Sequence, residues 1–171
     1  MTIQSDEVVI REIGVGDYPD VLALNSVEQH FTSEIDGNRL DELIRWSAHH
    51  RVACSGRTVF GFILAMGQSS AYDGVNFRWF ADRYPSFLYV DRIVVARESK
   101  GRGIGAALYR DLFAQAAKMG VPVITCEINV EPPNPASLAF HERFGFREVG
   151  RASSGNGLKQ VSYQQAHVRE N

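Results

Sequence analysis

The sequence predicts an α/β fold, classed as α+β by some schemes, with a mixed central sheet of about six or seven strands flanked by about four helices. Residues 87–95 are mostly apolar or aromatic, which is typical of a strand buried on both faces. From Ile104 to Met119, apolar residues recur at steps of three and four, as in an amphipathic helix. A second apolar run follows at 121–128, and the order strand, helix, strand implies a right-handed parallel crossover.

The other elements follow from apolar periodicity, capping residues and turns. Further strands are expected at 8–13, 51–55, 58–66, 146–152 and 160–167. Further helices are expected from Asp17, from Asn38 to about Ala48, and from Asn134 to Gly145. Asp17 can cap the first of these, Pro19 suits its first turn, and Asn134 can cap the third. The turn Ser55-Gly-Arg predicts a hairpin between the second and third strands.

Residues 67–86 show no clear period but contain five aromatic residues: Tyr72, Phe77, Trp79, Phe80 and Tyr84. A loop of this length inside a compact domain is usually functional or a partner surface. Two interpretations stand side by side. The aromatics either plug the core beneath the loop, or they form an acceptor wall or a homodimer contact.

Composition narrows the function classes. The 171 residues fit a single domain spanning 1–171, and the formal net charge of −2 offers no basic field for nucleic acid or an anionic membrane. No apolar run approaches the ~20 residues of a membrane span, and the N-terminus lacks the features of a signal peptide. Cys54 and Cys126 match no metal or redox spacing, so we expect no metal site and a reducing, cytoplasmic location.

A glycine-rich turn, Lys100-Gly-Arg-Gly-Ile-Gly105, separates the central strand from its helix. Glycine permits positive φ angles that turn the amides of this segment outward, and these amides would lie at the positive end of the helix dipole, which favours a phosphate. A P-loop is excluded because no Gly-Lys-Ser/Thr follows. A dinucleotide fingerprint fits the spacing, but residues 96–100 intervene after the strand, so a nicotinamide-dependent oxidoreductase is the less favoured interpretation.

Two motifs together resemble the GNAT superfamily of N-acetyltransferases. The segment from Lys100 to Gly105 is similar to the acetyl-CoA pyrophosphate loop of that family, with lysine where glutamine or arginine is usual. A second set matches the spacing of the family's later motif: Asn134, Ser137, Phe140, His141, Gly145 and Phe146. The resemblance covers nearly the whole chain. It implies a GNAT fold whose sheet is splayed at the cofactor cleft.

The resemblance also implies acetyl-CoA as cosubstrate. In the family, backbone groups of the strand before the loop pair with pantetheine amides, and loop amides hold the diphosphate. The implied cofactor-binding residues in this sequence are Ile93, Val94, Val95, Lys100, Gly101, Arg102, Gly103, Ile104, Gly105 and Asn134.

Candidate catalytic residues are His141, Asp91 and Glu127. His141 stands where the family commonly has a tyrosine acid, and it either protonates the departing thiolate or packs beside the cofactor. Asp91 is preferred as the base, or it is simply paired with a neighbour; Glu127 on the next strand is the other candidate. His30, Glu34 and Glu131 are compatible with an acceptor entrance or with plain solvation.

The predicted activity is therefore transfer of acetyl from acetyl-CoA to a primary amine by direct attack on the thioester. The acceptor is a small-molecule or peptide amine. The rival interpretation is a catalytically silent acyl-CoA-binding sensor or scaffold.

Overall fold

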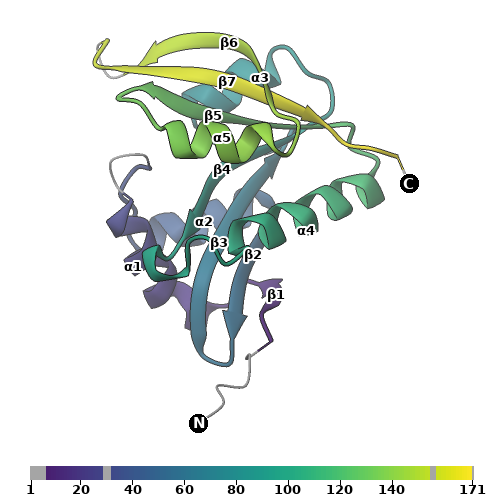
Figure 1. The fold of residues 1–171 in the computed structure, drawn as a ribbon. Coiled ribbons are helices and arrows are strands. Elements are labelled where there is room, and N and C mark those ends of the chain that lie inside the picture. The colour runs from purple at the N-terminus through teal and green to yellow at the C-terminus, as the bar shows by residue number, and fades with distance from the viewer. Residues whose placement is uncertain (1–6, 29–31, 155–156, 171) are drawn as a thin grey trace. The chain divides into compact units, whose positions relative to one another are not determined.

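The computed structural model describes residues 7–28, 32–154 and 157–170, which form seven strands and five α-helices (Figure 1). The strands are β1 (Val9–Glu12), β2 (Ser47–Ser55), β3 (Thr58–Gly67), β4 (Leu88–Val95), β5 (Val123–Glu131), β6 (Arg147–Ser154) and β7 (Lys159–His167). The helices are α1 (Tyr18–Val27), α2 (Gly37–Trp46), α3 (Val75–Ala81), α4 (Ile104–Met119) and α5 (Pro135–Glu142). The predicted α/β class is confirmed.

The chain divides into two compact units, one of residues 1–65 and 92–112 and one of residues 66–91 and 113–171. Hydrogen bonding gives the strand order β1-β2-β3-β4 in the first unit and β4-β5-β7-β6 in the second, so β4 contributes its two halves to different units. The β4–β5 pairing is parallel and the β5–β7 and β6–β7 pairings are antiparallel. The predicted parallel crossover and the predicted number of strands are confirmed.

The boundary between α2 and β2 lies earlier than the sequence indicates. The predicted helix extends to about Ala48, but α2 ends at Trp46 and β2 begins at Ser47. Ser47 has extended backbone angles and its hydroxyl donates to the carbonyl of Ile44 at 2.7 Å, so it terminates the helix. The histidines at 49 and 50 consequently lie within a strand rather than near a helix end.

Asp17 does not cap α1, contrary to the prediction. Its carboxylate accepts two hydrogen bonds from the guanidinium of Arg11, at 2.7 and 2.8 Å, and one from the amide of Gly14 at 2.8 Å. The ion pair with Arg11 lowers the pKa of Asp17. Asp17 therefore ties the end of β1 to the turn before α1, an interaction that depends on tertiary placement.

His49 is fully enclosed between β2 and α4 in the first unit. Its Nε2 lies 3.3 Å from Oδ2 of Asp111, and Nε of Arg51 lies 3.5 Å from the same oxygen. Burial, followed by repulsion from the charge of Arg51 and from His50 when it is protonated, lowers the pKa of His49 to about 4. His49 is therefore neutral in the folded protein at physiological pH.

This burial predicts an acid-sensitive fold. Because the folded pKa of His49 lies below its unfolded value, the unfolded state binds more protons as the pH falls from about 6.5 to 4, so stability is lost over that window. Relative to pH 7.5, the parent should lose about 2–3 kcal/mol more unfolding free energy at pH 4.5 than His49→Gln. Urea denaturation of both proteins at the two pH values measures this. An equal loss in both would contradict the assignment.

Helix α3 is the main element that the sequence analysis missed. Within residues 67–86, which show no clear period, Val75–Ala81 form a helix whose Phe77 and Phe80 are buried. Trp79 stacks on Tyr163 of β7 with ring centroids 4.3 Å apart, and Gly150 of β6 has no side chain at a point where a Cβ would lie 2.7 Å from the indole. The aromatic-plug interpretation of this segment is therefore correct for these three side chains.

Candidate active site

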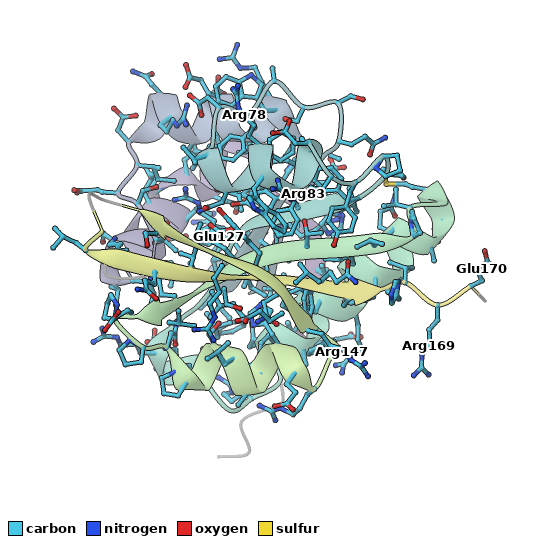
Figure 2. The ribbon with its side chains drawn as sticks, turned by 90° about the horizontal axis from the view of Figure 1, so that it is seen from above. Arg78, Arg83, Glu127, Arg147, Arg169 and Glu170 are labelled. Carbon is cyan, nitrogen blue, oxygen red and sulfur yellow. The ribbon has the colours of Figure 1, made fainter. Side chains whose placement is uncertain are left out.

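A carboxylate and tyrosine cluster lies on one face of the second unit's strands. Tyr89 of β4 pairs in register with Thr125 of β5, and Glu127, two residues on, pairs with Tyr163 of β7. Since alternate residues of a strand share a face, the side chains of these four residues project to the same side. Helices α3 and α5 cover opposite faces of β5 and β7, and Glu127 lies on the face covered by α3, the helix that carries Arg78 (Figures 1 and 2).

Glu127 is held by two hydrogen-bond donors. The hydroxyl of Tyr89 donates to Oε2 of Glu127 at 2.6 Å, and the side chain of Asn76 on α3 is a second partner. Burial raises the pKa of Glu127 to about 7, the nearby charge of Asp91 adds to the rise, and the bonds from Tyr89 and Asn76 oppose it. A carboxyl that titrates near neutral pH is suited to accept a proton from a reacting group.

Asp91 lies beside this carboxyl. It follows Tyr89 by two residues on β4, and the hydroxyl of Tyr72 donates to its Oδ1 at 2.5 Å. The rings of Tyr72 and Tyr89 stack with centroids 6.2 Å apart. The structure thus brings together Asp91 and Glu127, the two predicted base candidates, through two tyrosines.

Tyr72 and Asn76 are site residues that sequence reasoning did not identify. Both come from the segment between β3 and β4, for which an acceptor wall was one of the two interpretations. Tyr163 was also missed, because its place opposite Glu127 depends on the register of β5 and β7. The available signal was the unusual length and aromatic content of residues 67–86.

His141 lies on α5 and is 5% exposed. Its Nδ1 is 2.7 Å from the carbonyl oxygen of Ser137, which can only accept, so Nδ1 carries the proton. Its ring packs edge-to-face against Phe140 and Phe146 at 5.4 and 5.1 Å. Burial lowers the pKa of His141, which keeps the ring neutral and leaves Nε2 unprotonated. These contacts favour packing, the second of the two roles left open by the sequence.

Asn134 caps α5 as predicted. Its side-chain oxygen accepts from the amide of Ser137 at 3.4 Å, Pro135 occupies the first helical position, and Gly145, at φ 85°, follows the end of the helix. The local sequence therefore determines where α5 begins and ends, and so places Asn134 at its start and His141 in its last turn.

The glycine-rich turn lies in the first unit and has an open backbone surface. Gly101 and Gly103 have φ angles of 80° and 81°, and a Cβ added at either would meet no atom within 4 Å. The amide of Ala107 makes the first bond of α4, to the carbonyl of Gly103, so the amides of residues 104–106 have no acceptor within the helix. The amide of Arg102 donates to the carbonyl of Ser99 at 3.3 Å.

Ser99 supports an anion at this turn. The residue is 1% exposed, yet among the described residues its Oγ has no hydrogen-bond partner. A buried hydroxyl next to a helix start whose amides lack acceptors is a set of donors that fits a diphosphate. The residues of this turn therefore fit the diphosphate of acetyl-CoA, the group that the sequence predicts to bind here.

Two cations flank the turn and meet one carboxylate. Nζ of Lys100 lies 3.4 Å and Nε of Arg97 lies 3.8 Å from Oε1 of Glu28 at the end of α1. A cleft of about 470 Å³ opens beside them in the first unit. It is lined by Asp20, Ala23, Leu24, Val27, Glu28, Val59, Val95, Ala96, Arg97 and Glu98.

The pairing of β4 with β5 stops early. Among the described residues it is confined to Leu88 with Ile124 and Tyr89 with Thr125. Within the second unit, residues 90 and 91 of β4 therefore have no ladder partner on β5.

Within the described residues, no group of three or more potential metal ligands occurs, and no helix is long and apolar enough to span a membrane. Cys54 and Cys126 are buried free thiols. Glu34 and Glu131 are exposed, and His30 lies outside the described residues.

Comparison with known proteins identifies the family. The sequence model of the acetyltransferase (GNAT) family matches residues 17–146. The chain is 26% identical over 146 residues to an L-methionine sulfoximine/L-methionine sulfone acetyltransferase of Pseudomonas paraeruginosa, covering 83% of this chain and 81% of that one. It is 41% identical over 58 residues to a phosphinothricin N-acetyltransferase of Streptomyces coelicolor, covering 34% and 33%.

Solved structures show the same fold. The structure of Ard1 from Thermoplasma volcanium superposes with a TM-score of 0.76 at 18% identity, covering 95% of this chain and 99% of that one. At this identity the likeness concerns the fold alone. With the family match spanning most of the sequence, these findings show that the chain belongs to the GNAT family of acetyltransferases.

Proposed function

We propose that this GNAT acetyltransferase transfers acetyl from acetyl-CoA to a primary amine, with Glu127 accepting the proton that the acceptor ammonium must lose. The observation that carries the proposal is the half-buried Glu127, whose pKa is raised to about 7 by burial and by Asp91. An amine becomes nucleophilic only when neutral, and a base of this pKa is half ionised near neutral pH. Glu127 therefore takes precedence over Asp91 as the base.

The proposed reaction is a direct displacement. The acceptor ammonium is attracted by Asp91 and Glu127, and Glu127 takes one of its protons. The amine nitrogen then forms a bond to the thioester carbonyl carbon, and the carbon–sulfur bond breaks to release coenzyme A as its thiolate. The nitrogen loses a second proton to solvent as the amide forms, and the thiolate takes up a proton from solvent to give the thiol. In this proposal His141 packs α5 and supplies no proton, because its Nδ1 proton is donated to the carbonyl of Ser137.

Acetyl-CoA binding is proposed at the glycine-rich turn and along β4. The amides at the start of α4 and the hydroxyl of Ser99 would hold the diphosphate, with Lys100 adding positive charge. Because the amide of Arg102 is engaged within the turn, we place the donors at Ile104, Gly105 and Ala106. Backbone groups of Ile93–Val95 would pair with the pantetheine, and the remaining predicted residues, Gly101, Gly103 and Asn134, shape the site.

The acceptor class and location are also proposals. The relatives named above act on methionine derivatives and phosphinothricin, which supports a small polar amine over a peptide. Two buried free thiols support a reducing, cytoplasmic setting. Homodimerisation stays a prediction.

The test is release of coenzyme A thiol from acetyl-CoA with a panel of amines. The panel contains methionine sulfone, methionine sulfoximine, phosphinothricin, a polyamine and a peptide with a free N-terminal alanine, and mass spectrometry of the product locates the acetyl group. We expect amine-dependent release with at least one small amine. Release with the peptide alone would overturn the acceptor class. No release with any amine, together with tight acetyl-CoA binding, would favour the sensor interpretation.

A further inference from the structure

Tyr163 is clamped in one orientation on the face of the second unit that carries Glu127. Its ring stacks on Trp79 at 4.3 Å and meets Phe80 edge-on at 5.2 Å, both from α3. The absence of a side chain at Gly150 makes room for Trp79. The ring of Tyr163 is 2% exposed, so its hydroxyl has a fixed direction.

That hydroxyl orients an amide. It donates to Oδ1 of Asn76 at 2.9 Å, which places the oxygen of the amide toward Tyr163 and its NH₂ group on the other side. Tyr163 pairs in register with Glu127, so the amide that its hydroxyl contacts lies near that carboxylate, and Asn76 favours the ionised form of Glu127, as expected of a donor. The order of contacts is therefore Tyr163 to Asn76 to Glu127, with Tyr89 as the second donor to the same carboxylate.

The two donors have a chemical consequence. Burial and the charge of Asp91 both disfavour the carboxylate form of Glu127, and without compensation the group would be protonated at neutral pH. Loss of a hydrogen bond to a charged group is typically enough to change the titration point of the acceptor by about one pH unit or more. The donors thus decide whether the base is ionised in the working range.

We propose that Asn76 and Tyr163 are positioning residues for the base: Tyr163 fixes the amide of Asn76, and Asn76 holds the carboxylate of Glu127 ionised and aimed for proton transfer. Helix α3, inserted between β3 and β4, thereby sets the acidic limit of activity. This proposal rests on Glu127 being the base of the proposed function.

The test is a titration of Glu127 that does not require turnover. Carboxyl resonances of the full chain, labelled with ¹³C at glutamate side chains, are followed by NMR from pH 4 to 9. The Glu127 signal is identified by its loss in Glu127→Gln. We expect Asn76→Leu to move the titration point of Glu127 upward by about one pH unit and Asn76→Asp, which is nearly isosteric but adds a negative charge, to move it further.

Tyr163→Phe keeps the ring and its packing, so it tests only whether the hydroxyl orients the amide of Asn76. We expect a smaller upward shift of the titration point of Glu127 than in Asn76→Leu. Tyr84→Phe is the matched control. The hydroxyl of Tyr84 donates to Gln165 at 2.5 Å, so this variant loses the same kind of hydrogen bond at another place on the second unit. In this control, Glu127 should titrate at the same pH as in the parent protein. Unchanged or lower titration points in both Asn76→Leu and Tyr163→Phe would overturn the proposal.

The same variants are then assayed with the acceptor found in the amine panel. The acidic limb of kcat/KM should move upward with the NMR titration in Asn76→Leu and Tyr163→Phe, whereas the rate at high pH should approach that of the parent. A purely structural defect would lower the rate at every pH, and that result would overturn the positioning role. An inactive parent would instead reject the proposed function while the NMR titration still decides the hydrogen-bond assignment.

Discussion

Glu127→Gln is expected to lower kcat/KM for acetyl transfer by about 10²–10⁴-fold at pH 7, which is the usual range for loss of a general base. Glutamine keeps the size of the side chain and still accepts the hydrogen bond from Tyr89, but it takes no proton from the acceptor. The loss should shrink as the pH rises and more of the amine is neutral in solution. Steady-state kinetics from pH 6 to 10 measure it.

The comparison variant is Asp91→Asn. Removing the charge of Asp91 should lower the pKa of Glu127, because that charge contributes to its rise, and the acidic limb of the profile should move downward. Activity at high pH is expected to remain. If Asp91→Asn were inactive and Glu127→Gln retained its rate, Asp91 would be the base, as the sequence alone suggests.

Gly103→Val is expected to weaken acetyl-CoA binding by about 10- to 100-fold, since a residue forced into a disfavoured backbone region costs about 1–3 kcal/mol. Gly103 has a φ of 81°, and a β-branched residue adopts that conformation poorly. The turn would then relax and misdirect the amides at the start of α4. Isothermal titration calorimetry measures the dissociation constant.

Gly120→Val is the control: it introduces similar backbone strain at a glycine outside the proposed acetyl-CoA site. Gly120 follows the other end of α4, has a φ of 68°, and has no atom within 4 Å of an added Cβ. Both variants should lose thermal stability, but Gly120→Val should bind acetyl-CoA like the parent. Equal affinity in all three proteins would show that the turn does not hold the diphosphate.

The sequence predicts the parts of this fold whose cause is local. The amphipathic pattern of α4, the cap at Asn134 and the hairpin at Gly56 each depend on a few neighbouring residues, and the structure shows all three. The end of α2 at Trp46 was misjudged because Ser47 continues the helical spacing of Leu40, Leu43 and Ile44, whereas its hydroxyl ends the helix by donating to the carbonyl of Ile44.

The candidate site is only partly local, and the sequence predicts it accordingly. Asp91 and Glu127 were found because they lie on recognisable strands. The partners of these carboxyls were not identified. Tyr72 and Asn76 lie in a segment without a clear period, and Tyr163 lies on a strand whose register no sequence pattern determines. Which of the two carboxyls is better suited to act as the base depends on burial and on the hydrogen bond from Tyr89, and both follow from the folded structure rather than from a sequence pattern.

Calorimetry of the parent protein with coenzyme A and with pantetheine tests the diphosphate site most directly. The predicted result is saturable heat with coenzyme A at micromolar to low millimolar concentration and none with pantetheine, which has no diphosphate for the amides at Ile104–Ala106. Absence of heat with coenzyme A at millimolar concentration, or equal affinity for the two ligands, would contradict the proposed use of this turn.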